Sequence, residues 1–102
     1  MDYTDDSSGI QVTIRFFGLF KQITQKREFS LVLPQNTTVS SLLEAILNEF
    51  PQMKEKIFDE QYKVHNWVII LINGRNINIY EGLNTSLKGE DIVAIFPPVA
   101  GG

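Results

Sequence analysis

Alternating hydrophobic and polar positions predict two strands at the start of the ordered chain. Val12, Ile14 and Phe16 alternate with polar positions, the period-two pattern of a half-buried strand, and Gly18 interrupts it. Residues 27–33 alternate in the same way, so we expect a second strand that forms a hairpin with the first. The apolar side chains on one face of this second segment are Phe29, Leu31 and Leu33.

A single apolar stripe then predicts the main helix. The positions that recur at helical spacing are Val39, Leu42, Leu43, Ile46, Leu47 and Phe50. Thr38 can serve as the N-cap, but Ser41 and Glu44 also have the spacing of a capping box, which leaves two possible starts one turn apart. Pro51 disfavours helical geometry at the residue before it, so we expect the helix to end at Phe50.

The second half of the chain predicts a short helical turn and three further extended segments. The turn is expected within residues 52–58, and the uninterrupted apolar run at 68–72 is typical of a central strand. Asn73-Gly74 favours a type I′ turn, because both central positions of that turn need positive φ. A short strand or extended segment is expected through 77–79, and residues 91–96 form the final predicted strand.

The order of these elements predicts the fold class. One helix with one apolar face must cover one apolar face of a sheet, which gives a two-layer α+β fold with a mixed sheet of four to five strands. The first and last strands are both candidates for the centre of the sheet. This arrangement is that of the ubiquitin-like β-grasp, whereas periodicity alone gives only an α+β fold with one helix on a mixed sheet. We expect a disordered acidic tail at residues 1–9, the β-grasp domain at 10–98 and a flexible Gly-Gly arm at 99–102.

Composition excludes several classes of function. The chain has 102 residues, a net charge of -3 and no run of basic residues, so we expect no nucleic-acid partner. The absence of cysteine excludes disulfides, thiolate metal sites and a cysteine nucleophile, and His65 is the single histidine, so no metal site is expected. The polar, acidic start MDYTDDSSGI is unlike a signal peptide, and no apolar run is long enough to span a membrane. We therefore expect a cytoplasmic protein with no membrane partner.

The last ten residues, VAIFPPVAGG, carry the strongest functional signal. Pro97 and Pro98 cannot donate ladder hydrogen bonds and keep the backbone stiff and extended as it leaves the last strand. At roughly 3.3 Å per extended residue, residues 99–102 can reach about 13 Å from the domain. Glycine at positions 101 and 102 removes the side chains that would block a narrow channel. This pattern suggests that the reacting group is the terminal carboxylate itself.

Four segments resemble a known family. AIFPPVAGG resembles the end of the MoaD-like small subunits of molybdopterin synthase, sulfur carriers of the MoaD/ThiS superfamily. VTIRFFGLFKQIT resembles their opening strand, paired aromatic residues and short helical turn, and LINGRNI and LKGEDIVAIF resemble their later strands in order and spacing. The resemblance covers nearly all of residues 10–102. Residues 1–9 are additional, and DEQYKVHNW at 59–67 is longer and more polar than the usual connection.

The resemblance implies a mechanism and a set of partners. An ATP-dependent activating enzyme, a MoeB-like adenylyltransferase, would adenylate the carboxylate of Gly102, and a sulfur donor protein would convert it to a thiocarboxylate. Gly101 would let the arm thread into the MoaE-like large subunit of molybdopterin synthase, which transfers the sulfur to the pterin precursor of the molybdenum cofactor. The carrier would bind no cofactor, because ATP is used by the activating enzyme. It would act as a co-substrate rather than as a catalyst.

The resemblance also suggests which residues contact partners. The arm and its root should dock through Phe96, Pro97, Pro98, Val99, Ala100 and Gly101. Phe17 and Phe20 are further candidates for an apolar docking face. A strand buries alternate residues, so Phe16 or Phe17 must belong to the core, and Phe20 has the alternative of packing under the helix.

Other functions fit the same sequence. An archaeal-type ubiquitin-like modifier would use the adenylate to join Gly102 to lysines of other proteins. Related carriers supply sulfur to thiamine synthesis or tRNA thiolation, although FPP before the arm is less similar to the thiamine carriers. In a plain interaction module the two glycines would be incidental, and deletion of Gly102 would leave its activity intact.

Overall fold

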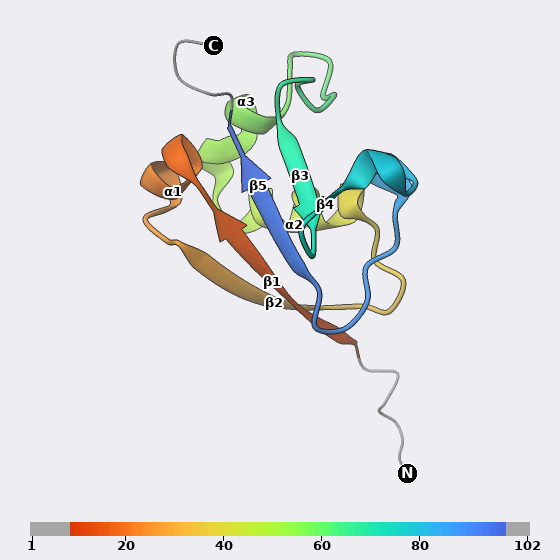
Figure 1. Cartoon of the computed structure of the whole chain (residues 1–102). Helices are drawn as coiled ribbons and strands as arrows, with labels where there is room; N and C mark the ends of the chain where they lie inside the picture. Colours follow the sequence, from red (N-terminus) through yellow and green to blue (C-terminus); the bar gives the residue numbers. More distant parts are fainter. Residues whose placement is uncertain (1–8, 98–102) are drawn as a thin grey trace.

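Five strands form one mixed sheet in the order β2-β1-β5-β3-β4 (Figure 1). The structure is a computed structural model, and it describes residues 9–97. The strands are β1 (Ile10–Phe16), β2 (Glu28–Leu33), β3 (Ile69–Ile72), β4 (Arg75–Asn76) and β5 (Ile92–Phe96). One main helix, α2 (Val39–Glu49), covers one face of the sheet, which confirms the predicted two-layer α+β fold (Figure 1).

The two strands farthest apart in the sequence are neighbours in the sheet. β1 and β2 form the predicted antiparallel hairpin, with Ile10 opposite Leu33. On its other side β1 pairs in parallel with β5, with Phe16 opposite Ile95, and β5 pairs antiparallel with β3. The prediction that the first and last strands lie inside the sheet is therefore confirmed, and β5 is its middle strand.

The helix begins and ends as the sequence predicts. The hydroxyl oxygen of Thr38 accepts a hydrogen bond from the backbone N–H of Ser41 at 3.2 Å, so Thr38 is the N-cap. Phe50 is the C-cap, directly before Pro51. The expected helical turn consists of η2 (Pro51–Met53) and α3 (Lys54–Ile57), and the remaining helical segments are α1 (Gly18–Thr24), η3 (Ile77–Ile79) and η4 (Gly82–Asn84).

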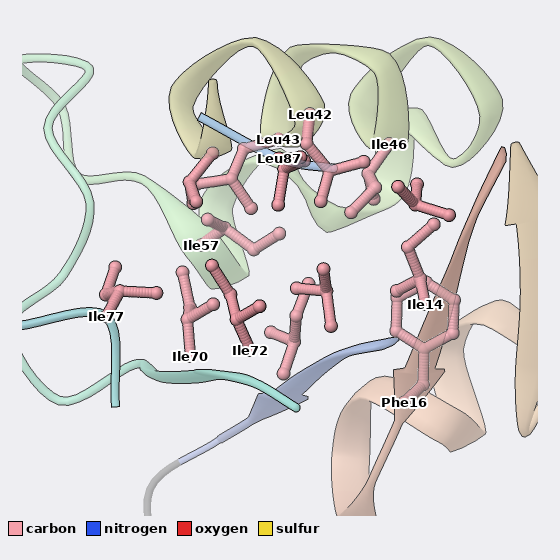
Figure 2. Packing of buried hydrophobic residues seen from close by; sticks show 14 of the residues in the cluster. Ile14, Phe16, Leu42, Leu43, Ile46, Ile57, Ile70, Ile72, Ile77 and Leu87 are labelled. Atoms are coloured by element: carbon pink, nitrogen blue, oxygen red, sulfur yellow. The ribbon is translucent and has the colours of Figure 1, made fainter. Parts of the chain in front are cut away.

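The core lies between α2 and the inner face of the sheet. Figure 2 shows side chains from α2 facing those of β1 and β3, with Ile57 of α3 between them. Leu42, Leu43 and Ile46 are completely buried, as their helical spacing predicts. The side chains of one face of β1 (Val12, Ile14, Phe16) are buried against them. This packing makes the sheet a rigid support for the chain that leaves it at the end of β5.

One expectation for the segment after α3 needs correction. Residues 77–79 form the 3-10 helix η3 rather than a strand, because the Asn76 side chain accepts a hydrogen bond from the Asn78 N–H at 2.8 Å and caps a helical turn. The apolar run forms a strand inside the sheet as expected, because β3 pairs with β5 on one side and with β4 on the other, although Ile69 is 43% exposed. The predicted Asn73-Gly74 turn is confirmed, with φ of 51° and 88° at the two residues.

The ends of the chain lie outside the described residues. This applies to residues 1–8 of the predicted acidic tail and to the predicted arm at 99–102. Gly9 is described, and a Cβ built on it would lie 2.7 Å from the Leu33 carbonyl oxygen, so it packs closely against the end of β2. Among the helices of residues 9–97, none has the length and apolar character needed to cross a membrane.

Candidate functional site at the root of the C-terminal segment

The site is the point where the chain leaves the middle of the sheet after β5. We call this point, at Phe96 and Pro97, the exit. β1 ends with Phe16 pointing into the core, 1% exposed, so the next residue along the extended chain, Phe17, points to the opposite face. Phe96, the last residue of β5, points to this outer face too. The rings of Phe17 and Phe96 stack with their centroids 4.3 Å apart and their planes 12° apart. The two stacked rings form an aromatic pair beside the exit.

Gly18 allows the chain to turn immediately beside this exit. Its φ is +55°, in the left-handed region that favours glycine, and α1 starts at this residue. A Cβ built on Gly18 would lie 3.1 Å from Cγ of Pro97, so Pro97 would have to shift by a few tenths of an ångström to admit it. Glycine at position 18 is therefore favoured both by the backbone conformation and by the closeness of Pro97.

The sheet face opposite α2 is divided into an apolar and a polar half. Ile69 lies opposite Phe96, and Leu71 lies opposite Ala94, so these side chains form rows across β3 and β5. We call the following set the apolar outer face: Phe17, Ile69, Leu71, Ile92, Ala94 and Phe96.

Polar pairs occupy the other half of this face, over β1 and β2. Arg15 and Glu28 form an ion pair with Nε and Oε1 3.2 Å apart, and the hydroxyls of Thr13 and Ser30 are 3.5 Å apart. Ion pairs between exposed groups contribute little to stability, so this half is chiefly a solvated surface. The exit at Pro97 thus lies at the edge of the apolar half.

The structure brings together three of the predicted docking residues. Phe17, Phe96 and Pro97 lie side by side at the exit, and Phe17 is 38% exposed. The prediction for Phe20 is wrong, because its side chain is 0% exposed and belongs to the core, on the turn of α1 that faces inward. The other predicted site residues lie outside the described part of the chain: Pro98, Val99, Ala100, Gly101 and Gly102.

Sequence reasoning missed four members of the apolar outer face. Ile69 and Leu71 lie in an apolar run that is typical of a strand buried on both sides, and Ile92 and Ala94 lie in a strand without a distinguishing feature of its own. The signal was present in the pairing that the fold imposes: every second residue of β3 and β5 must point away from α2. Within residues 9–97 no helix covers this face, and apolar side chains gathered there make it a candidate surface for a partner.

The ionisable groups with shifted pKa values lie elsewhere, in the loop between α3 and β3. The backbone N–H groups of Lys63 and Gln61 donate to the Asp59 carboxylate at 3.0 and 2.8 Å and lower the pKa of Asp59. The Tyr62 hydroxyl donates to the Glu44 carboxylate at 2.7 Å, which raises the pKa of Tyr62. These bonds hold a polar loop against α2, and no residue of the apolar outer face takes part in them.

The contacts of His65 are with residues of its own loop and of α3. Its ring stacks on Trp67 with centroids 4.2 Å apart, and its Nε2 lies 3.1 Å from the backbone oxygen of Glu55. Within residues 9–97 there is no group of three or more His, Cys, Asp or Glu side chains placed to hold a metal ion. The features that the structure gathers at the described site are an exposed apolar surface and a pair of stacked aromatic rings.

Comparison with known proteins gives these features a context. The model of the ThiS family matches residues 14–102. Small archaeal modifier protein 3 of Haloferax volcanii is 29% identical over 94 residues, which cover 91% of this chain and 100% of that protein. The molybdopterin synthase sulfur carrier subunit of Arabidopsis thaliana is 23% identical over 97% of this chain and 91% of its own length.

A solved structure agrees with the arrangement described above. The solution structure of small archaeal modifier protein 1 from Methanosarcina acetivorans superposes with a TM-score of 0.78 at 32% identity, covering 92% of this chain and 98% of that one. The matched family range begins in β1 and includes the exit after β5 and both final glycines. The resemblance seen in the sequence is thereby confirmed: the chain belongs to the ThiS family and has the ubiquitin-like β-grasp fold of its sulfur carriers.

Proposed function

We propose that the protein is a sulfur carrier that works through the α-carboxylate of Gly102, and that it serves as the small subunit of molybdopterin synthase. The observation that carries this proposal is the ThiS family match, which continues through the exit at Pro97 to residue 102. The similarity to the Arabidopsis molybdopterin synthase sulfur carrier subunit, over most of both chains, supports the choice of pathway.

The chemistry requires an activated carboxylate. A free carboxylate is a poor electrophile, so one of its oxygens first attacks the α-phosphate of ATP on an activating enzyme and releases pyrophosphate. Hydrosulfide released by a donor protein then attacks the carbonyl carbon of the acyl adenylate and displaces AMP, so that the incoming sulfur stays on the carbonyl carbon of Gly102. The product is a thiocarboxylate, a stronger nucleophile than the original carboxylate, and it can transfer its sulfur to a pterin precursor. ATP is held by the activating enzyme and not by this chain.

In this proposal the described residues bind the partner and place the C-terminal segment, and they do not take part in the chemical steps. The apolar outer face lies beside the exit, so a partner that covers Ile69 and Phe96 is positioned to receive the residues after Pro97. An activating enzyme, a sulfur donor and a large synthase subunit would use this face one after another. Because each complex must dissociate before the next can form, we expect interfaces of moderate affinity.

A second function is favoured by a specific observation. Small archaeal modifier protein 3 aligns with this chain over its whole length, so a role as a protein modifier is the principal alternative. In that case a lysine amine of another protein attacks the acyl adenylate or a derived thioester, and an isopeptide bond forms at Gly102. Both functions begin with the same activated carboxylate and differ in the nucleophile that reacts with it next.

Intact-mass analysis tests the shared chemistry. The protein is incubated with ATP, the activating enzyme of its own genome and a sulfide source, and we expect a mass gain equal to exchange of one oxygen for sulfur. The matched control lacks Gly102; it should unfold at the same temperature as the native chain and show no exchange. Failure of the native chain to gain mass, under conditions that load a known carrier, would contradict the proposal.

Two further measurements separate the pathway from the alternative. With a large synthase subunit and the pterin precursor present, loaded protein should lose its sulfur as the pterin gains it. For the modifier function, lysines that carry residues 89–102 of this chain, the remnant left by tryptic cleavage after Lys88, should be found in tryptic digests of its native cells. Conjugates without any sulfur transfer would replace the synthase assignment by the modifier one.

A further inference from the structure

Two contacts hold the chain at the point where it leaves the sheet. The ring of Pro97 rests on the Cα side of Gly18, where a Cβ would come within 3.1 Å of Cγ. One residue earlier, the Phe96 ring is stacked on Phe17 at 4.3 Å. Two consecutive residues of the turn between β1 and α1, Phe17 and Gly18, therefore contact the two consecutive residues of the exit. Phe17 contacts Phe96, and Gly18 contacts Pro97.

We propose that this turn is a clamp that fixes the direction in which the C-terminal segment leaves the domain, and that Gly18 and Phe17 are positioning residues for the reaction at the chain end. The inference rests on the proposed function, because it concerns how the reacting carboxylate is presented. It assigns to the FFG sequence at 16–18 a role that strand and turn formation alone do not require.

The benefit of such a clamp is entropic. A flexible segment loses conformational freedom when it enters a channel in a partner, and each residue that must be ordered on binding weakens the association. Fixing the backbone at Phe96 and Pro97 in the free protein means that only the residues beyond Pro97 need to be ordered. A rigid starting point also restricts the volume that the chain end can sample, which raises its local concentration at the partner's channel.

A second glycine allows the effect of the Pro97 contact at Gly18 to be measured apart from the effect of its positive φ. Gly82 has a φ of +59°, close to the +55° of Gly18, but a Cβ built on Gly82 would have no heavy atom within 4 Å. The two glycines therefore share the strain that an alanine would introduce, and only Gly18 has a neighbour from the exit. Gly82→Ala is accordingly a matched control for Gly18→Ala.

The test measures pyrophosphate release by the activating enzyme as a function of carrier concentration. For Gly18→Ala we expect KM to be about threefold to tenfold above that of Gly82→Ala, from the cost of ordering one additional residue. The kcat of the two variants should agree, because the clamp no longer matters once the segment is bound. Their unfolding midpoints should fall by similar amounts relative to the native protein.

A double-mutant cycle provides a second measurement that does not depend on Gly18→Ala folding. Either Phe17→Ala or Phe96→Ala removes the same ring stack, so the clamp predicts that the rise in KM of the double variant is clearly smaller than the product of the rises in the two single variants. If the two rings instead contact the enzyme independently, their effects on KM multiply in the double variant.

The outcomes distinguish the inference from the function on which it rests. Equal KM values for Gly18→Ala and Gly82→Ala, or multiplicative effects in the cycle, would overturn the clamp and leave the sulfur-carrier proposal intact. Absence of pyrophosphate release with the native protein would remove the proposed function, and the clamp with it.

Discussion

The rings of Phe16 and Phe50 meet at nearly a right angle, with centroids 5.7 Å apart and planes 86° apart. Phe16 is the last residue of β1 and Phe50 is the C-cap of α2, so this pair joins the end of the helix to the sheet. Phe29 of β2 meets Phe50 in a similar way at 5.2 Å. The three rings lie on the buried side of β1. The residue after β1, Phe17, lies on the opposite side and stacks on Phe96 at the exit.

Phe16 should therefore contribute far more to stability than its neighbour in the sequence. Phe16→Ala leaves a cavity against Phe50 and should lower the free energy of unfolding by about 3–5 kcal/mol. Phe17→Ala is the matched control, and it should cost less than about 2 kcal/mol because that ring is already partly in water. Denaturant unfolding of both variants gives the two values, and equal losses would show that the core does not depend on the Phe16 contact.

Ile69 should matter for partners and not for folding. Ile69→Asp places a charge in the apolar outer face, where covering it by a partner would bury an unpaired carboxylate, so affinity for the activating enzyme should fall about tenfold or more. Val32→Asp is the control, since Val32 is 71% exposed on β2 over the polar half of the same sheet. Titration calorimetry with the enzyme compares the two, and equal affinities would place the docking surface elsewhere.

Tyr62 should ionise later than an ordinary tyrosine. Its hydroxyl donates to Glu44, and ionisation would set two negative charges side by side, so the pKa of Tyr62 lies above 10.0. A raised pKa means that the contribution to stability is complete below the ordinary value and is lost as pH rises through the raised one. Titration followed by tyrosinate absorbance should show a late step that Tyr62→Phe removes and that Glu44→Gln moves to lower pH.

Asn73 should depend on Asp91 as its partner. The Asn73 amide donates to an Asp91 carboxylate oxygen at 2.9 Å, and its own oxygen accepts from the Ile92 N–H at 2.9 Å. Asn73→Asp replaces the donor by a second negative charge and should lower the free energy of unfolding by about 1–3 kcal/mol. Adding Asp91→Asn restores an amide and a carboxylate at the same contact and should recover most of the loss. Thermal unfolding at neutral pH tests this, and a double variant no more stable than the single one would contradict the pairing.

The strands and the main helix were predictable because each has one buried face and therefore a clear period. Val12, Ile14 and Phe16 follow period two, and the stripe of α2 follows the helical period. Ile77 and Ile79 were misleading, because apolar residues two apart indicate a strand while the Asn76 side chain favours a helical turn. A local hydrogen bond thus decided the conformation of that segment.

The candidate site was predictable only in part. Phe96 and Pro97 stand out in the sequence because they precede the final glycines. The membership of Ile69 depends on strand order, since a continuous apolar run does not reveal whether one or both faces are covered. Phe20 was predicted at the docking surface and lies in the core instead. On a helix as short as α1, the side chain that points into the core depends on the angle at which the helix leaves β1, and the sequence does not give this angle.

The parallel pairing of β1 with β5 has a consequence for synthesis of the protein in the cell. A ribosome makes β1 and β2 early, but the strand that covers the inner edge of β1 is translated only after nearly the whole domain. Until then the nascent hairpin exposes an unpaired edge that can attach to other chains. Messages that end prematurely would thus yield aggregation-prone fragments, and only a chain translated through β5 can complete the sheet.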